Sequence, residues 1–213
     1  MAVRMTIVMR ALPALALLLV LGGCRTSMPV RPTAGTAPHA ASVNQAPQDA
    51  FWQRLQALCG RAYRGRLTEG NASDSTFRRA ELVMHVRQCS PSEVRVPFHA
   101  GADRSRTWVI TRTRDGLRLK HDHRHADGGE DRVTQYGGDT RDAGSAARQD
   151  FFADAHTASL IPAARANVWT MEVVPSTRFA YALRREGTDR RFRVEFDLAT
   201  PVAAPPPPWG AAP

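Results

Sequence analysis

Three histidines at alternate positions, His121, His123 and His125, form the densest group of potential metal ligands in the chain. If this run continues the strand pattern of Leu117 and Leu119, all three imidazoles lie on the face of those leucines, because strand side chains alternate. Neighbouring imidazoles are then about 6.6 Å apart along the strand, close enough for two to bind one ion, whereas the outer two are about 13 Å apart. Zinc or copper fits such a pair, since both metals accept imidazole.

The same run has two other interpretations, and the sequence leaves all three open. In one, the histidines end a charged strand, and Asp122 and Arg124 form surface ion pairs before the glycine-rich turn at 126–131. In the other, the histidines belong to an interior cluster that binds a ligand. The charged strand end is the simplest of the three.

No motif with a known catalytic role is present in the sequence. The segment 144–146, Gly-Ser-Ala, lacks the second glycine of a nucleophile elbow. The segment 136–140 lacks the lysine of a phosphate loop. We therefore expect no catalytic residue and no cofactor, with zinc or copper as the alternative.

The elements that must position these residues are strands, because apolar and polar side chains alternate over most of the chain after position 80. Turn sequences at Asp115-Gly116 and at Glu186–Asp189 separate adjacent runs. The pattern predicts a mainly β fold, an antiparallel β-barrel or barrel-like meander of about eight to ten strands with one short N-terminal helix. The predicted strands lie at 82–86, 94–98, 107–111, 117–120, 132–137, 147–153, 167–174, 178–184 and 192–196.

A helix is predicted from Ala50 to about Tyr63, with Asp49 as its N-cap. Its apolar residues recur at the spacing of one helical face, at Phe51, Leu55 and Leu58. A single helix before a strand meander favours a barrel with that helix plugging one end.

The first 23 residues have the layout of a secretory signal, with two arginines before an apolar run too short to span a bilayer. The run ends in Leu21-Gly22-Gly23-Cys24, which resembles the lipobox of bacterial lipoproteins. The resemblance implies that Cys24 becomes the first mature residue and is acylated, so that membrane lipid is a partner. By the sorting pattern of the enteric bacterial lipoproteins that the segment resembles, Arg25 after the cysteine implies export to the outer membrane, facing the periplasm.

Once Cys24 is assigned to lipid, Cys59 and Cys89 remain as a pair in an oxidising compartment, where disulfides persist. A bridge between them would close a loop of about thirty residues and stabilise the fold by roughly 3 kcal/mol. Two buried free thiols are the alternative.

Arginine dominates the charge of the chain, which is +9 overall and contains a single lysine, Lys120. Codon bias in a GC-rich genome explains this more simply than a basic surface for anionic lipid headgroups. We expect no nucleic-acid partner. The predicted organisation is a signal peptide at 1–23, a Pro/Ala-rich tether at 24–48, a β domain at 49–200 and a Pro-rich tail at 201–213.

Two further resemblances concern the β domain. The segment 58–65 resembles the Gly-x-Trp opening of calycin barrels, the lipocalin-like group, with Tyr63 in place of tryptophan. A second similarity is to a family of uncharacterised secreted or lipid-anchored proteins from proteobacteria, and it rests on the segments 51–60, 120–125, 135–140 and 192–197. This similarity does not assign any particular activity to the chain. We therefore expect a lipid-anchored envelope protein that is a non-enzymatic binding or structural module, with an envelope small molecule or another envelope protein as its partner. A metal-binding protein or metal-dependent enzyme is the alternative.

Overall fold

A computed structural model describes residues 45–212. The predicted signal peptide, Cys24 and most of the tether lie outside this range. The described chain is mainly β, with five short helices: α1 (Ala46–Gln56), η1 (Ala72–Asp74), α2 (Ser75–Arg79), α3 (Ala155–Leu160) and η2 (Pro162–Ala164). The strands are β1 (Ala62–Gly70), β2 (Leu82–His85), β3 (Gln88–Cys89), β4 (Glu93–Ala100), β5 (Asp103–Thr113), β6 (Gly116–His123), β7 (Tyr136–Asp139), β8 (Arg148–Ala153), β9 (Asn167–Val174), β10 (Arg178–Arg185) and β11 (Arg191–Val202).

The strands form a closed antiparallel barrel of ten, as the alternating pattern predicts. From β4 to β11 each strand pairs with the next in the chain, and β11 then pairs with β1. The ring closes because β2 pairs with β1 on one side and β4 on the other, with Leu82 opposite Ala100. The two-residue strand β3 is an extra partner of β4.

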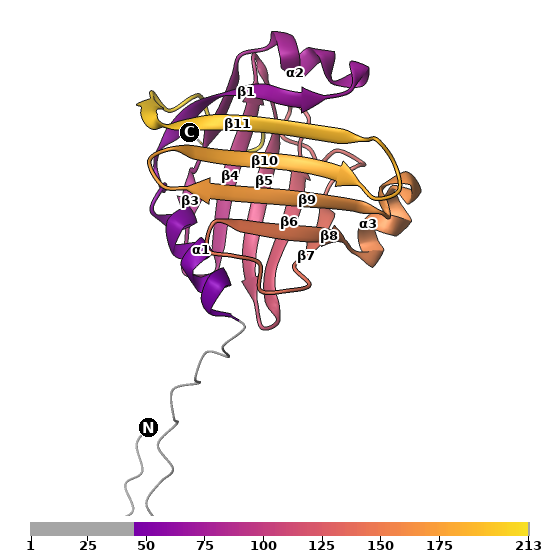
Figure 1. The fold of residues 1–213 in the computed structure, drawn as a ribbon. Helices are drawn as coiled ribbons and strands as arrows, with labels where there is room; N and C mark the ends of the chain where they lie inside the picture. Colours follow the sequence, from indigo (N-terminus) through magenta and orange to yellow (C-terminus); the bar gives the residue numbers. More distant parts are fainter. Residues whose placement is uncertain (1–44, 213) are drawn as a thin grey trace, which may run out of the picture. The chain divides into compact units, whose positions relative to one another are not determined.

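Helix α1 closes one end of the barrel (Figure 1). The predicted apolar residues Phe51 and Leu55 of this helix are buried, and so is Leu58, two residues after the helix ends. The helix begins earlier than predicted, at Ala46, because a proline stands in its first turn. The prediction that Asp49 caps the helix is wrong: its carboxylate lies one turn inside and pairs with Arg112 of β5. The helix also ends at Gln56, because the chain turns there to enter β1.

Several strands differ from prediction: β5, β6 and β11 extend further than predicted, β3 was not predicted, and β1 and β7 differ where the strands contain glycine. β1 was not predicted, since Gly65 reads as a helix end. In the barrel a Cβ atom added to Gly65 would lie 2.5 Å from a ring carbon of Phe196, which is too close for any residue except glycine. β7 begins at Tyr136 instead of position 132. Added Cβ atoms on Gly137 and Gly138 would collide with backbone carbonyls of β6 and β8, so only glycine lets these three strands approach.

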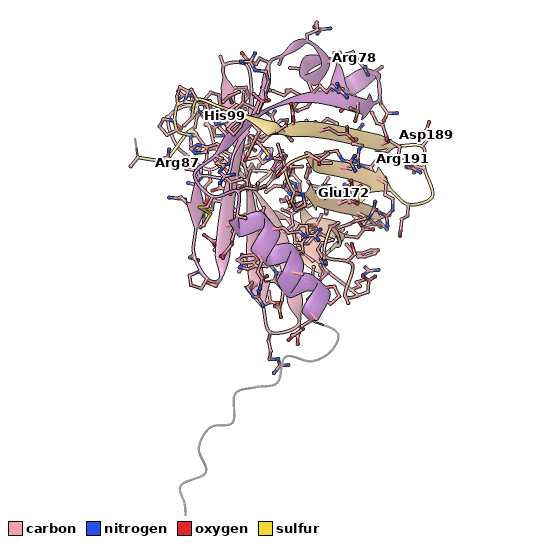
Figure 2. All side chains as sticks on the ribbon, turned by 60° about the vertical axis from the view of Figure 1, so that its left-hand side comes forward. Arg78, Arg87, His99, Glu172, Asp189 and Arg191 are labelled. Carbon is pink, nitrogen blue, oxygen red and sulfur yellow. A yellow bond between two sulfur atoms is a disulfide. The ribbon has the colours of Figure 1, made fainter. Side chains whose placement is uncertain are left out.

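Many arginines are paired with carboxylates on the outer wall. Glu172 of β9 (Figure 2) accepts hydrogen bonds from Arg193 at 2.8 Å, Arg178 at 3.2 Å and Arg148 at 3.2 Å. Arg193 also donates to Glu195 at 2.8 Å. A large part of the arginine content therefore forms cross-strand ion pairs.

The segment after α1 and the C-terminal tail are both fixed to the barrel wall. Cys59, just after α1, forms a disulfide with Cys89 of β3, so the predicted bridge is present. The tail lies along the wall, where Pro208 is buried, the guanidinium of Arg104 donates to the Pro207 carbonyl, and the Trp209 amide donates to the Arg104 carbonyl. Within residues 45–212, no helix combines the length and apolar character needed to cross a membrane.

Candidate ligand-binding pocket

The end of the barrel opposite α1 contains a pocket of about 270 Å³. We call it the mouth pocket. It is formed where the starts of β5, β9 and β11 meet the ends of β6 and β10, together with η1, α2 and η2. Its lining is mainly aromatic and apolar with a few polar groups: Asp74, Phe77, Phe98, Arg106, Trp108, His121, His123, Tyr136, Ile161, Ala164, Asn167, Trp169, Tyr181, Leu183, Arg185, Arg190 and Phe192. Such a lining is typical of small-molecule sites, and the volume lies just below their usual range of roughly 300–1,000 Å³.

Stacked rings form the floor of the mouth pocket. The indole of Trp108 stacks on Tyr181, with 4.4 Å between ring centroids, and on Phe98, with 4.9 Å. Deeper in the barrel, the interior is filled by Phe179 of β10 and Phe196 of β11. Interlocked aromatic pairs are rigid and stabilise each other beyond their area of contact. The floor is therefore a preformed aromatic surface.

His121 is buried in this floor and has both ring nitrogens occupied. Nδ1 lies 3.1 Å from the carbonyl oxygen of Tyr136, which only accepts, so Nδ1 carries the proton. Nε2 is then an acceptor and receives a hydrogen bond from the Tyr181 hydroxyl at 2.8 Å. Burial lowers the pKa of His121 to about 3, so the imidazole is neutral at physiological pH.

His123 also lines the mouth pocket, two residues further along β6. Its Nε2 lies 3.1 Å from the hydroxyl of Tyr136, whose ring stacks on His121 with 4.5 Å between centroids. Burial lowers the pKa of His123, and the nearby charge of Arg106 lowers it further. His123 is therefore a neutral member of an aromatic and polar cluster.

The structure brings two of the three predicted metal ligands together and leaves the third apart. His121 and His123 share the inner face, as the alternation predicts, whereas the side chain of His125 lies beyond the end of β6 and is 60% exposed. Within residues 45–212, no cluster of three or more His, Cys, Asp or Glu side chains is placed to hold a metal ion. Zinc or copper at these histidines stays a prediction, and elemental analysis of the purified protein tests it.

Arginines stand at the rim of the mouth pocket. Arg106 of β5 donates to Asp103 at 2.6 Å, and its guanidinium lies over the ring of Phe77, 5.1 Å from the centroid. Arg185, at the end of β10, uses its Nε to donate to the amide oxygen of Asn167 at 2.9 Å. The rim is thus positively charged while the floor is aromatic.

A short helical segment, η1 and α2, covers part of the mouth. Phe77 of α2 packs edge-on against Phe192, with 5.2 Å between centroids. The segment is fixed by Asp74, whose carboxylate forms a two-pronged ion pair with Arg190 of the β10–β11 turn. Arg190 also donates to the side chain of Asn71 at 2.9 Å. We call this group the Asp74–Arg190 latch.

No family model, curated protein or solved structure matches this chain.

Sequence reasoning identified His121 and His123 but missed the arginines and Tyr136 of the mouth pocket. A signal for the arginines was present in the alternation. Arg106 precedes Trp108 by two residues and Arg185 follows Leu183 by two, so both charged side chains stand on inward faces. An inward arginine at the end of a strand, repeated on two strands, indicates a polar opening in an otherwise apolar barrel.

Proposed function

We propose that this chain is a lipid-anchored protein of the bacterial cell envelope that binds a small, largely apolar molecule in the mouth pocket. One observation carries the proposal: the barrel is packed solid next to α1 but hollow at the opposite end, where aromatic side chains surround the space. A protein whose barrel served only as a structural support would gain stability by filling that space, since empty volume in a core is destabilising.

The proposed location rests on the lipobox resemblance at Leu21–Cys24 and on the cysteine pair. Disulfides are rare in reducing compartments and persist in the periplasm and outside the cell. The Cys59–Cys89 bridge is consistent with export. Acyl chains on Cys24 would anchor the barrel, because each buried methylene contributes about 0.8 kcal/mol.

Two measurements test ligand binding. The full-length protein is purified from a bacterial host and denatured, and the released small molecules are identified by mass spectrometry. In parallel, the protein is titrated with the neutral fluorescent probe N-phenyl-1-naphthylamine. We expect Leu183→Trp, which fills the mouth pocket, to weaken probe binding at least tenfold.

The matched control for this titration is Ala182→Trp, the adjacent residue of β10, which is not part of the pocket lining and pairs with Thr170 and Arg193. It should leave probe binding unchanged. Equal probe binding by the two variants, together with no released molecule, would show that the mouth pocket is not a binding site.

The anchor is tested separately by Cys24→Ala. We expect the wild-type protein to fractionate with membranes and to incorporate labelled palmitate, and the variant to do neither. A wild-type protein recovered in the soluble periplasmic extract would contradict the anchor and leave the ligand-binding part of the proposal standing.

A further inference from the structure

The polar groups of the mouth pocket are not evenly divided between donors and acceptors. Among residues 45–212, Arg106 uses one of its five N–H groups in a hydrogen bond to protein, and Arg185 likewise uses one. The amide nitrogen of Asn167 donates to no protein group in this range, while its oxygen accepts from Arg185. Three side chains thus present unused donors at the rim.

The strong acceptors of the same pocket are already used. The carboxylate of Asp74 receives Arg190 on both oxygens and the backbone N–H of Asn71 at 2.8 Å. Nε2 of His121 receives the Tyr181 hydroxyl. A ligand that needed to donate hydrogen bonds would find few partners, whereas a ligand that accepts them would find several.

The charge of the lining points in the same direction. Arg190 pairs with Asp74 and Arg106 with Asp103. Arg185 has no carboxylate partner among residues 45–212, and His121 and His123 are neutral. A cationic ligand would be repelled, and a neutral one would leave the donors of Arg106 and Arg185 without a strong acceptor. An anionic group at the rim would gain charge-assisted hydrogen bonds, which are roughly twice as strong as neutral ones.

We propose that the ligand of the mouth pocket is a small aromatic carboxylic acid, with its ring system on the floor of Trp108 and Tyr181 and its carboxylate between Arg106 and Arg185. The inference rests on the proposed binding function and specifies the chemical class that the pocket accepts. A planar body fits because stacked rings form the floor. A single negative charge fits better than a phosphate dianion, because the charges of Arg190 and Arg106 are already matched by Asp74 and Asp103, which leaves one unmatched positive charge, that of Arg185.

A matched pair of probes tests this inference: 2-naphthoate and 2-naphthamide, which have the same ring system and nearly the same size and differ in charge. Purified full-length protein is titrated with each by calorimetry, with Leu183→Trp as the background. We expect 2-naphthoate to bind at least tenfold more tightly than 2-naphthamide, and the difference to shrink at high salt.

Arginine variants locate the carboxylate. Arg106→Gln and Arg185→Gln should each weaken 2-naphthoate at least fivefold and change 2-naphthamide less than twofold. The controls are Arg112→Gln, on the same strand as Arg106 but paired with Asp49 at the closed end, and Arg184→Gln, next to Arg185 but paired with Asp150 on the outer wall. Both controls should bind 2-naphthoate as the wild type does.

The outcomes separate the two proposals. Equal affinities for 2-naphthoate and 2-naphthamide would overturn the acid specificity while the binding function stands. Tighter binding of 2-naphthyl phosphate than of 2-naphthoate would overturn the preference for a single charge. Binding of neither probe above the Leu183→Trp background, with no binding of the neutral fluorescent probe, would overturn both proposals.

Discussion

Two buried tyrosines differ in what their hydroxyl groups contact. The hydroxyl of Tyr181 donates to Nε2 of His121 at 2.8 Å, whereas that of Tyr63 is buried with no hydrogen-bond partner among residues 45–212. Removing one partner of a buried hydrogen bond leaves the other unsatisfied, which costs about 1–3 kcal/mol. Removing a hydroxyl that has no partner leaves nothing behind.

We therefore expect Tyr181→Phe to lower the free energy of unfolding by about 1–3 kcal/mol, and Tyr63→Phe to leave it unchanged or raise it slightly. Urea unfolding followed by tryptophan fluorescence measures both. Equal destabilisation by the two variants would contradict the hydrogen bond assigned to His121.

For individual residues, the sequence predicts which face of a strand a side chain occupies but not which side chains from distant strands contact one another. The alternation after Leu117 places His121 and His123 inward, and both are. The partner of His121 is Tyr181, 60 residues away, and the partner of Arg190 is Asp74, 116 residues away. Such pairs depend on strand register around a closed ring, which no local pattern specifies.

At the scale of elements, strands with large inward residues were predictable, and strands built on glycine were not. β9 and β10 lie at or within one residue of their predicted bounds because they carry large apolar residues at alternate positions. β1 and β7 depend on Gly65, Gly137 and Gly138, whose role is to admit a neighbouring ring or backbone. A missing side chain gives no periodicity, so these strands resemble turns in the sequence.

We expect the Asp74–Arg190 latch to limit how often the segment η1–α2 opens. Asp74→Asn weakens the ion pair with Arg190, so the segment should open more often. We expect faster hydrogen exchange at 71–79 and a loss of about 1–3 kcal/mol in the free energy of unfolding.

The control is Asp115→Asn, which removes the exposed ion pair with Arg114 and should change neither quantity. Unchanged exchange at 71–79 in Asp74→Asn would show that packing of Phe77, rather than the latch, holds this segment in place.

The disulfide predicts a loss of stability on reduction. It joins the turn after α1 to β3 and closes a loop with a sequence separation of 30. Replacing both Cys59 and Cys89 by alanine should lower the free energy of unfolding by roughly 3–4 kcal/mol in the loop-entropy model. Unfolding of the wild type with and without reductant checks this, and the double variant should no longer respond to reductant.

For the whole molecule, buried neutral histidines predict that acid weakens the fold. Burial lowers the pKa of His121 to about 3 and, together with the charge of Arg104, lowers that of His99 to about 4. Both values lie below the 6.5 of an unfolded chain, so the unfolded state binds more protons as pH falls below 6.5. Each histidine should remove about 2 kcal/mol from the free energy of unfolding between pH 7.5 and pH 5.

Urea unfolding at the two pH values measures this effect. His99→Gln should reduce the difference between them by about 2 kcal/mol. If His99→Gln retains the full difference, His99 is already protonated in the folded protein at pH 5.

The plug helix determines how any occupant exchanges with solvent. Because α1 fills one end, the barrel is open at the other end alone, and a bound molecule would enter and leave through that opening. The rate of exchange is then set at one place, the rim with its short helical cover, and cannot be changed by loosening the base. The described chain enters α1 from Gln45 at the closed end, so this entry point and the rim lie at opposite ends of the barrel.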